Sequence, residues 1–291
     1  MSAPAAAIGR RSRGDRVRGT AFYLLLLFAV SVGFLLLGTL LFDVVRKGFG
    51  YVDPILFTEP TSADPNKAGA GPAIRGTIYM MIILLVLVVP LGVGTAVYLE
   101  EYANRERWYN RLLELNIQNL AAVPSIVYGI LGLAFLVRGL GLGRVLLAGA
   151  LILTLLVLPT VIVASREALR AVPDTIRQGA YALGATQWQV VSRQVLPAAI
   201  PGIATGSILA LARAIGETAP LLLVGELTYV AVNPTLLGSF TALPVQNYQW
   251  IARPQDEFRL LAAAGIMVLL AILLTMNAFA IWLRNRYQKR W

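Results

Sequence analysis

The sequence contains neither cysteine nor histidine. Without cysteine it can form no disulfide and offers no thiolate to a metal, and without histidine the common zinc and haem ligand sets are missing. It also lacks the G-x-x-x-x-G-K-[ST] loop and a G-x-G-x-x-G turn after a strand, the two usual nucleotide-binding motifs. We therefore expect no metal, no cofactor and no catalytic residue, and any ATPase must lie on another chain.

Charge is scarce as well. Only 14% of the residues are charged and 57% are hydrophobic, with a mean hydropathy of +0.70, which excludes an ordinary soluble domain. Six stretches approach or exceed the about 20 residues that a membrane-spanning helix needs. These stretches are residues 21–42, 76–99, 115–137, 145–165, 199–224 and 260–283. Because alternating β-barrel patterning is absent, the sequence predicts an all-α integral membrane protein with six transmembrane helices.

The net charge of +10 has a topological explanation. In a soluble protein it would suggest a nucleic-acid partner, but cytoplasmic loops of membrane proteins collect Lys and Arg, so no nucleic-acid partner is expected. With both termini in the cytoplasm, sixteen Lys and Arg residues lie in inner segments and eight in outer loops. We expect residues 1–19 to form a cytoplasmic basic tail and residues 20–291 a single transmembrane domain.

The connections between spans carry three further expectations. Residues 46–73, rich in Pro, Gly, Asp and Asn, predict an outer loop with little regular structure. Tyr248 and Trp250 in a later outer loop are expected near the membrane interface. Residues 100–114 predict a solvated cytoplasmic helix with internal ion pairs such as Glu101–Arg105.

A charged loop, residues 166–197, precedes the fifth span. Residues 168–178 and 181–194 can each form a short helix, with breaks at Pro173 and around Gly184. Its alanines give one face only small side chains, while Tyr181, Leu183 and Trp188 offer apolar anchors. This combination suits insertion into a groove of a partner protein. The alternative is an amphipathic helix lying on the membrane surface.

This loop resembles the coupling loop of bacterial ABC importer permeases. Their pattern is E-A-A, three residues, Gly, nine residues, I-x-L-P; here Ala180, Gly184 and Leu196-Pro197 match it. Gln178, Gly179 and Gln194 depart from it. The resemblance implies that residues 178–186 dock on a cytoplasmic ATPase dimer as a coupling helix between spans 4 and 5. The candidate coupling residues are Gln178, Ala180, Tyr181, Leu183, Gly184, Ala185, Leu196 and Pro197.

The fifth span carries Arg213 and Glu217, four residues apart on one helical face. Arg213 lies about 21 Å into a core about 30 Å thick, where a charge costs about 2.5–3.5 kcal/mol. Its guanidinium suits an oxyanion, Glu217 would neutralise it when the path is empty, and Thr218 adds a hydroxyl. The alternative is a structural ion pair at a helix contact. Pro220 is expected to bend the span and free the carbonyl of Gly216.

The run 213–220, Arg-Ala-Ile-Gly-Glu-Thr-Ala-Pro, resembles the phosphate-specific branch of these permeases, and its continuation resembles one of that branch's two permease subunits. With the loop and the span layout, the resemblance covers most of the chain from Gly76 onward. It implies phosphate import through a pore shared with a companion permease in a bacterial inner membrane. The implied partners are two ATPase copies and an external phosphate-binding protein.

Three other functions stay open at this stage. A related permease could carry sulfate, molybdate or another anion. A secondary transporter could use Glu217 as a proton carrier and need no ATPase. A membrane anchor or receptor would keep Arg213 and Glu217 only for packing.

Overall fold

The computed structural model describes residues 13–104, 106–225 and 233–287. Their regular secondary structure is helical, apart from one isolated bridge between Val145 and Ser239. The all-α prediction is therefore confirmed. The chain divides into two compact units, Met1–Lys47 and Gly48–Trp291. The first contains nearly all of α1 (Arg13–Gly48), a 36-residue helix that includes the predicted first span.

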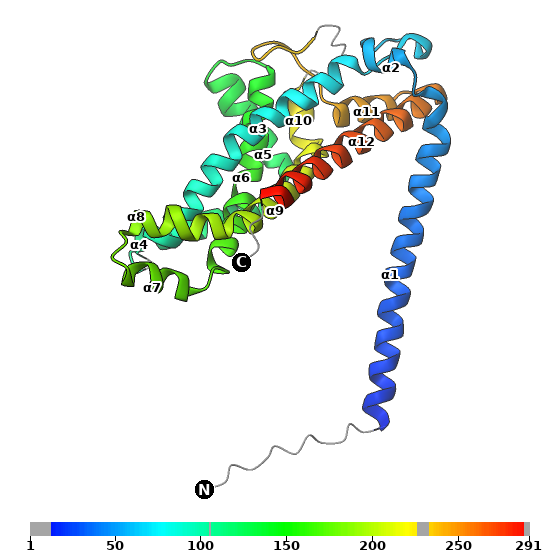
Figure 1. Ribbon diagram of the computed structural model, residues 1–291. Coiled ribbons are helices and arrows are strands. Elements are labelled where there is room, and N and C mark those ends of the chain that lie inside the picture. Colours follow the sequence, from blue (N-terminus) through cyan, green and yellow to red (C-terminus); the bar gives the residue numbers. More distant parts are fainter. Residues whose placement is uncertain (1–12, 105, 226–232, 288–291) are drawn as a thin grey trace. The chain divides into compact units, whose positions relative to one another are not determined.

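The second unit contains the other helices (Figure 1). They are α2 (Pro54–Thr58), α3 (Gly71–Val97), α4 (Trp108–Ala121), α5 (Ser125–Gly132), α6 (Leu146–Arg170), α7 (Asp174–Ala182), α8 (Gln187–Val190), α9 (Leu196–Ile215), α10 (Ala219–Val224), α11 (Leu243–Ile251) and α12 (Asp256–Tyr287). Three π-helical turns extend them: Tyr98–Tyr102 follows α3, Leu133–Gly139 follows α5, and Val191–Val195 joins α8 to α9.

Among the described residues, five helical segments are long and apolar enough to cross a membrane. They lie in α1, α3, α6, α8–α9 and α12. The helices α4 and α5 make a sixth crossing if the bent pair counts as one span. Six spans, as predicted, fit this arrangement.

Two predicted spans are broken helices. The span at 115–137 divides into α4 and α5 with a bend of 104°, because Pro124 takes an extended backbone (ψ 138°) and has no N–H to continue the ladder. The span at 199–224, expected to bend at Pro220 and to free the carbonyl of Gly216, is interrupted just before that proline. Its helix already ends at Ile215 and resumes at Ala219, and the hydroxyl of Thr218 donates to the carbonyl of Gly216 at 3.2 Å.

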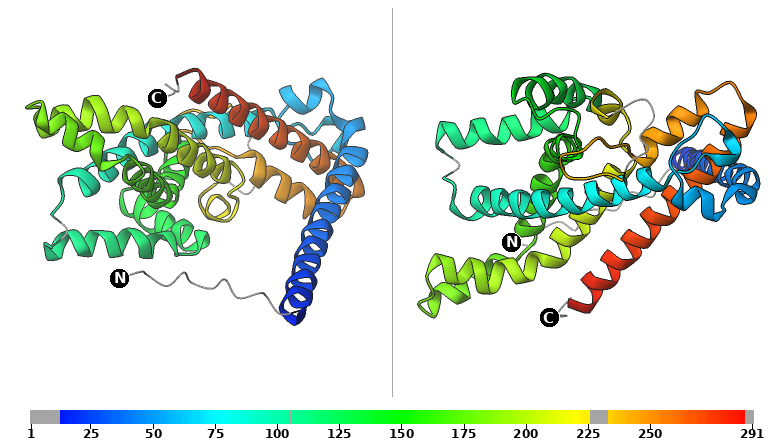
Figure 2. Two further views of the ribbon diagram at one scale, coloured as in Figure 1. Left: turned by 60° about the horizontal axis from the view of Figure 1, so that its bottom comes forward. Right: turned by 90° about the horizontal axis from the view of Figure 1, so that it is seen from above.

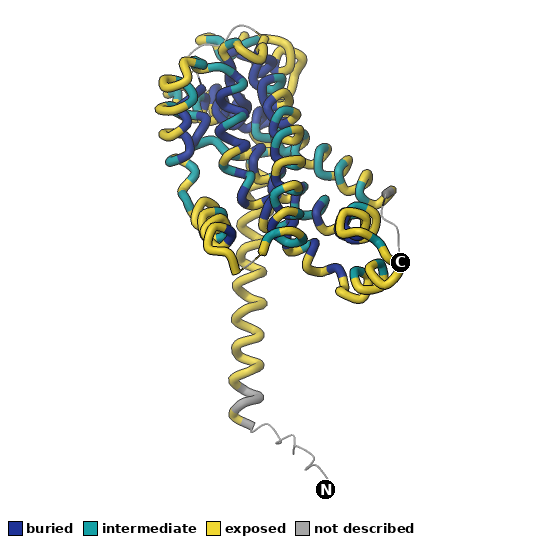
Figure 3. Tube along the Cα trace, turned by 90° about the vertical axis from the view of Figure 1, so that its left-hand side faces the viewer, coloured by how far each residue is buried: buried dark blue, intermediate teal, exposed yellow. Residues whose placement is uncertain are grey.

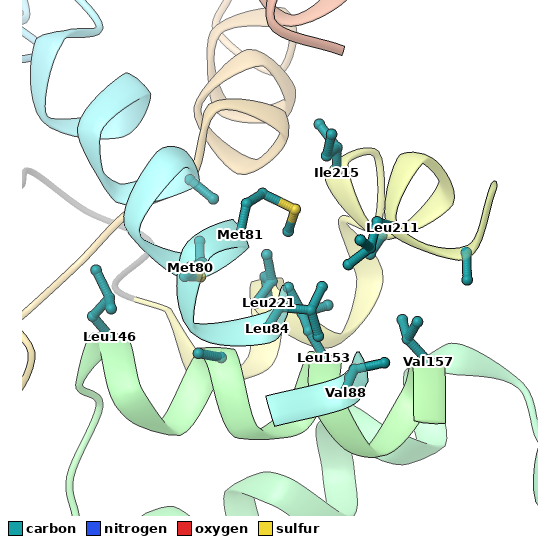
Figure 4. Close-up of a cluster of buried hydrophobic side chains, with 14 of the residues drawn as sticks. Met80, Met81, Leu84, Val88, Leu146, Leu153, Val157, Leu211, Ile215 and Leu221 are labelled. Atoms are coloured by element: carbon teal, nitrogen blue, oxygen red, sulfur yellow. The ribbon is translucent and has the colours of Figure 1, made fainter. Parts of the chain in front are cut away.

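The largest core lies among α3, α6, α9 and α10 (Figure 4). Figure 4 shows side chains of all four helices, among them Leu84, Leu153, Leu211 and Leu221, pointing toward one another. Figure 3 shows buried residues gathered in the interior of the helical bundle and exposed residues on its outer faces. Each fully buried leucine contributes about 1.5–3 kcal/mol if water is the reference solvent. In the bilayer the free energy of helix association comes from close packing instead. The shapes of the helix surfaces therefore decide which faces meet.

Glycines let α9 approach α6 closely. A Cβ added to Gly206 would lie 2.4 Å from the Cβ of Ala164, and one added to Gly202 would lie 2.8 Å from the Cβ of Ala168. The Gly-x-x-x-Gly spacing puts both glycines on one helical face, where only hydrogen fits. The contact therefore fixes α9, which carries Arg213, against α6.

We expect Gly206→Ala to destabilise the fold by about 1–3 kcal/mol, because the methyl group forces α9 away from α6. Thermal unfolding of the purified protein in detergent measures the loss. The matched control is Gly94→Ala in α3, where an added Cβ meets nothing within 4 Å. That change is expected to be neutral or slightly stabilising, since alanine is the better helix former. Equal melting temperatures for the two variants would contradict the packing account.

The connection at 46–73 is more ordered than its composition predicts. It contains α2 and the 3₁₀ turns Phe49–Tyr51 and Pro65–Lys67, and Leu56 is fully buried. Trp250 was expected at the interface but is also fully buried, where its indole N–H lies 3.4 Å from the hydroxyl of Thr61. The two segments form one apolar cluster with α12, which is why neither behaves as a free loop. Tyr248 is exposed.

Candidate functional site

The helices α4, α7 and α8 lie at one end of the second unit, and α2 and α11 lie at the other (Figures 1 and 2). The helix α7 follows Pro173, as predicted, and its chain reverses at Gly184, whose φ is +79°. Thr186 then caps α8 through a capping box with Gln189. The two short helices thus exist, but their bounds, Asp174–Ala182 and from Gln187 onward, differ from those predicted.

The outer surface of this turn is apolar and open. Leu183 is 90% exposed, and Tyr181 and Trp188 are exposed beside it. Gln178 and Gly184 are exposed too. A groove of about 470 Å³ runs along this surface, lined by residues that include Ile176, Gly179, Leu183, Gly184 and Gln189. Such a groove beside a protruding leucine is suited to a partner protein.

Of the remaining candidate coupling residues, Ala180 and Ala185 also line this groove. Ala180, Ala185 and Leu196 are partly buried against the cluster that contains Leu169 and Val195. Pro197 is exposed in the first turn of α9. These inward residues attach the turn to the ends of α3, α6 and α9, while the outward ones are left for binding.

An ion-pair network that the sequence did not predict holds this turn. Glu100 bonds to Arg166 (Nε–Oε2 3.4 Å) and to Arg170 (Nε–Oε1 2.9 Å), and Glu101 bonds to Arg177 (Nη2–Oε1 2.8 Å). Arg166 also contacts Glu114 of α4. The side chains of Glu100 and Arg166 are only 5% and 7% exposed, so the network is largely shielded from solvent.

This network adds long-range pairs that the expectation of pairs within residues 100–114 did not include. Glu100 and Glu101 belong to the π-helical turn that ends α3, and their partners lie 66–76 residues further along the chain. The predicted partner Arg105 lies outside the described residues. The hydrogen bond from Glu101 raises the pKa of Arg177, so this guanidinium stays charged. The alternating charges were visible in the sequence, but nothing there shows which pairs meet.

Arg213 and Glu217 do come together, at the break between α9 and α10. The Nε atom of Arg213 lies 3.4 Å from Oε1 of Glu217. The arginine side chain is 72% exposed and the glutamate only 15%. Thr218 lies beside them but donates its hydroxyl to the backbone. Within the described residues, Nε is the one donor of Arg213 with a partner, so the rest of its fork is available to an anion.

Two helix breaks meet at this pair. A small cavity of about 30 Å³ is lined by Val123, next to the α4–α5 break, and by Arg213 and Glu217 at the α9–α10 break. Thr160 of α6 adds a hydroxyl to the lining. Broken helices in membranes occur where irregular backbone lines a cavity or is covered by protein. Among the described residues, this pair included, no group of three or more Asp and Glu side chains is placed to hold a metal ion.

A model of the protein family described as binding-protein-dependent transport system inner membrane component matches residues 88–290. The chain is 36% identical over 216 residues to phosphate transport system permease protein PstA 1 of Mycobacterium tuberculosis, covering 74% of this chain and 70% of that protein. It is 35% identical over 243 residues to phosphate transport system permease protein PstA of Yersinia pestis, covering 83% and 81%.

Solved structures show the same fold at lower identity. A chain in the crystal structure of a bacterial alginate ABC transporter, in complex with an alginate pentasaccharide-bound periplasmic protein, superposes with a TM-score of 0.69. It is 17% identical, and the match covers 96% of this chain and 99% of that one. The six-span arrangement with a turn before the fifth span is therefore an ABC importer permease fold.

Proposed function

Because the chain belongs to the family of binding-protein-dependent transport system inner membrane components, we propose that it is one of two permease subunits of an ATP-driven importer of inorganic phosphate. It is not itself an enzyme, since ATP hydrolysis belongs to a partner ATPase. The observation that carries the phosphate assignment is the open guanidinium of Arg213 in a chain at least 35% identical to two phosphate permeases.

We place Arg213, Glu217 and Thr218 on the substrate path. An arginine fork binds the oxygens of a phosphate through two parallel hydrogen bonds. Glu217 holds the guanidinium by one nitrogen at 3.4 Å and balances its charge when no anion is present. Because the arginine side chain faces outward from this subunit, the companion permease completes the path.

The second half of the proposal concerns the exposed surface of the turn around Leu183, which we assign to ATPase docking. Leu183, with Gln178, Tyr181 and Gly184, docks on the ATPase dimer, and an external phosphate-binding protein delivers the substrate. The helical run from α8 through α9 links the docked turn to Arg213 without a gap. Gln178 brings no charge to this contact, whereas Arg193, which lines the groove, does.

The orientation follows from the same assignment. ATPase docking requires the turn between α6 and α9 to be cytoplasmic. With six spans, this places both termini in the cytoplasm, in agreement with the excess of Lys and Arg in the inner segments. Residues 1–19 then form a basic tail at the inner surface of the bacterial cell membrane, and residues 20–291 form one transmembrane domain.

Radiolabelled phosphate uptake in cells that lack this chain tests the proposal. Restoring the chain is expected to restore uptake, and excess sulfate or molybdate is expected not to inhibit it. Inhibition of phosphate uptake by those anions would instead assign another oxyanion. Uptake that survives ATP depletion but fails when the proton gradient is collapsed would favour the secondary transporter.

A further inference from the structure

One side chain, Arg177, joins three helices at the coupling turn. Its Nη2 donates to Oε1 of Glu101 at 2.8 Å and its Nε lies 3.4 Å from Oε2 of the same carboxylate. Its Nη1 and Nη2 also donate to the carbonyl oxygens of Val172, at 2.7 Å, and Leu169, at 2.9 Å. A further contact joins Nη1 to Asp174 at 3.1 Å.

These five contacts match the five N–H donors of a guanidinium. Arg177 therefore has no donor left for the ATPase, even though it lies on the helix that docks. The carbonyl of Leu169 belongs to the last turn of α6 and that of Val172 lies two residues past the helix end, where a cation also interacts favourably with the helix dipole. Lysine has three donors on one nitrogen and cannot make this set of contacts.

The other arm of the turn is attached to Glu101 as well. The side-chain amide of Gln187, at the start of α8, donates to the carbonyl oxygen of Glu101 at 2.6 Å. Glu101 thus binds α7 through its carboxylate and α8 through its backbone, on the two sides of Gly184. It lies in the π-helical turn that ends α3, and its side chain is 9% exposed.

The helix α3 continues from this attachment into the main core. Gly92 packs against Val161 of α6, and Leu84 and Val88 lie in the cluster that contains Leu211 and Ile215 of α9 (Figure 4). Those two residues flank Arg213 in sequence. A displacement of α7 can therefore reach the Arg213 segment by a second route, through Glu101 and α3.

We propose that Arg177 and Glu101 are positioning residues that transmit movement of the coupling turn to α3, in parallel with the covalent route through α9. The proposal rests on the docking of the ATPase described above. The two routes reach the core cluster from two of its helices, so the turn moves α3 and α9 together. Without the Arg177–Glu101 link, α7 moves while α3 stays behind.

The test uses the complete reconstituted transporter and measures phosphate transported per ATP hydrolysed. Arg177→Lys and the isosteric Glu101→Gln are expected to lower this ratio about fivefold or more, with ATP hydrolysis retained. The matched control is Asp256→Asn, which removes an exposed ion pair to Arg259 within one helix. Its ratio is expected to equal that of wild type.

The possible outcomes separate this inference from the proposed function. A wild-type complex that transports no phosphate would refute the proposed function itself. Wild-type ratios in both variants, or equal loss of uptake and hydrolysis, would overturn the inference and leave the permease assignment standing. Failure of both variants to assemble would assign the pair to folding and overturn the inference as well.

Discussion

Arg213→Gln is expected to abolish phosphate uptake while the transporter still assembles. Glutamine keeps a polar side chain, though a shorter one, and loses the charge and the two-pronged donor face. Two hydrogen bonds to a charged group contribute about 1.5–3 kcal/mol each. Losing both corresponds to about a hundredfold or greater loss of affinity for phosphate on the path. Because the arginine side chain is 72% exposed and has one side-chain partner at 3.4 Å, its removal leaves the helix packing intact.

Radiolabelled uptake and pull-down of the partner subunits from the same cells measure the two parts of this prediction. Arg259→Gln is the matched control, since that arginine is 63% exposed and pairs with Asp256 of its own helix. The structural alternative makes the opposite prediction: a double Arg213→Leu, Glu217→Leu variant would then transport like wild type. Normal uptake by an assembled Arg213→Gln variant would remove Arg213 from the path.

Leu183→Asp is expected to release the ATPase from the membrane subunits. Leu183 is 90% exposed, so an aspartate there makes no unfavourable contact within the chain. In the docked state the same aspartate would lose its water and find an apolar surface. Loss of a central apolar anchor typically costs 2 kcal/mol or more, so we expect ATPase affinity to fall about thirtyfold or more.

Pull-down of the ATPase by tagged permease measures this loss, and the melting temperature of the permease shows whether its fold is intact. Leu237→Asp is the control, because Leu237 is also exposed, at 67%, but lies in the segment between α10 and α11. The control is expected to retain the ATPase. An ATPase bound equally well by Leu183→Asp would show that docking uses another surface.

Hydropathy was enough to predict the helical fold and the number of spans, although two of the predicted spans are broken helices. The short coupling helices and the turn at Gly184 were also predictable, because proline and glycine act through local backbone geometry. The pairing of Arg213 with Glu217 follows from helical spacing in the same way, although α9 ends between the two residues. Local backbone geometry and helical spacing therefore predict contacts between residues up to about one helical turn apart.

The remaining features depend on contacts between distant residues. Pro124 and Pro159 both lie in apolar runs, yet the chain breaks at Pro124 while α6 continues through Pro159. Which proline breaks a helix depends on the neighbours that satisfy the freed carbonyl groups. Glu101 could have paired with several arginines, and only the packed structure selects Arg177. The sequence allowed Trp250 to lie either at the membrane interface or in the protein core, and the structure buries it in the core.

The exposure of Arg213 also affects the stability of the subunit before it assembles with its partner. In the proposed pore the companion subunit covers this guanidinium, whereas in a subunit without its partner the side chain stays 72% exposed, at a position that the sequence places within the membrane core. That charge costs about 2.5–3.5 kcal/mol on insertion scales, which is a substantial part of the stability of a typical fold. A lone subunit is therefore the less stable form, and cellular proteases act on such forms preferentially. In the proposed assembly, Arg213 thus also favours equal numbers of the two permease subunits, because unpaired copies are degraded sooner.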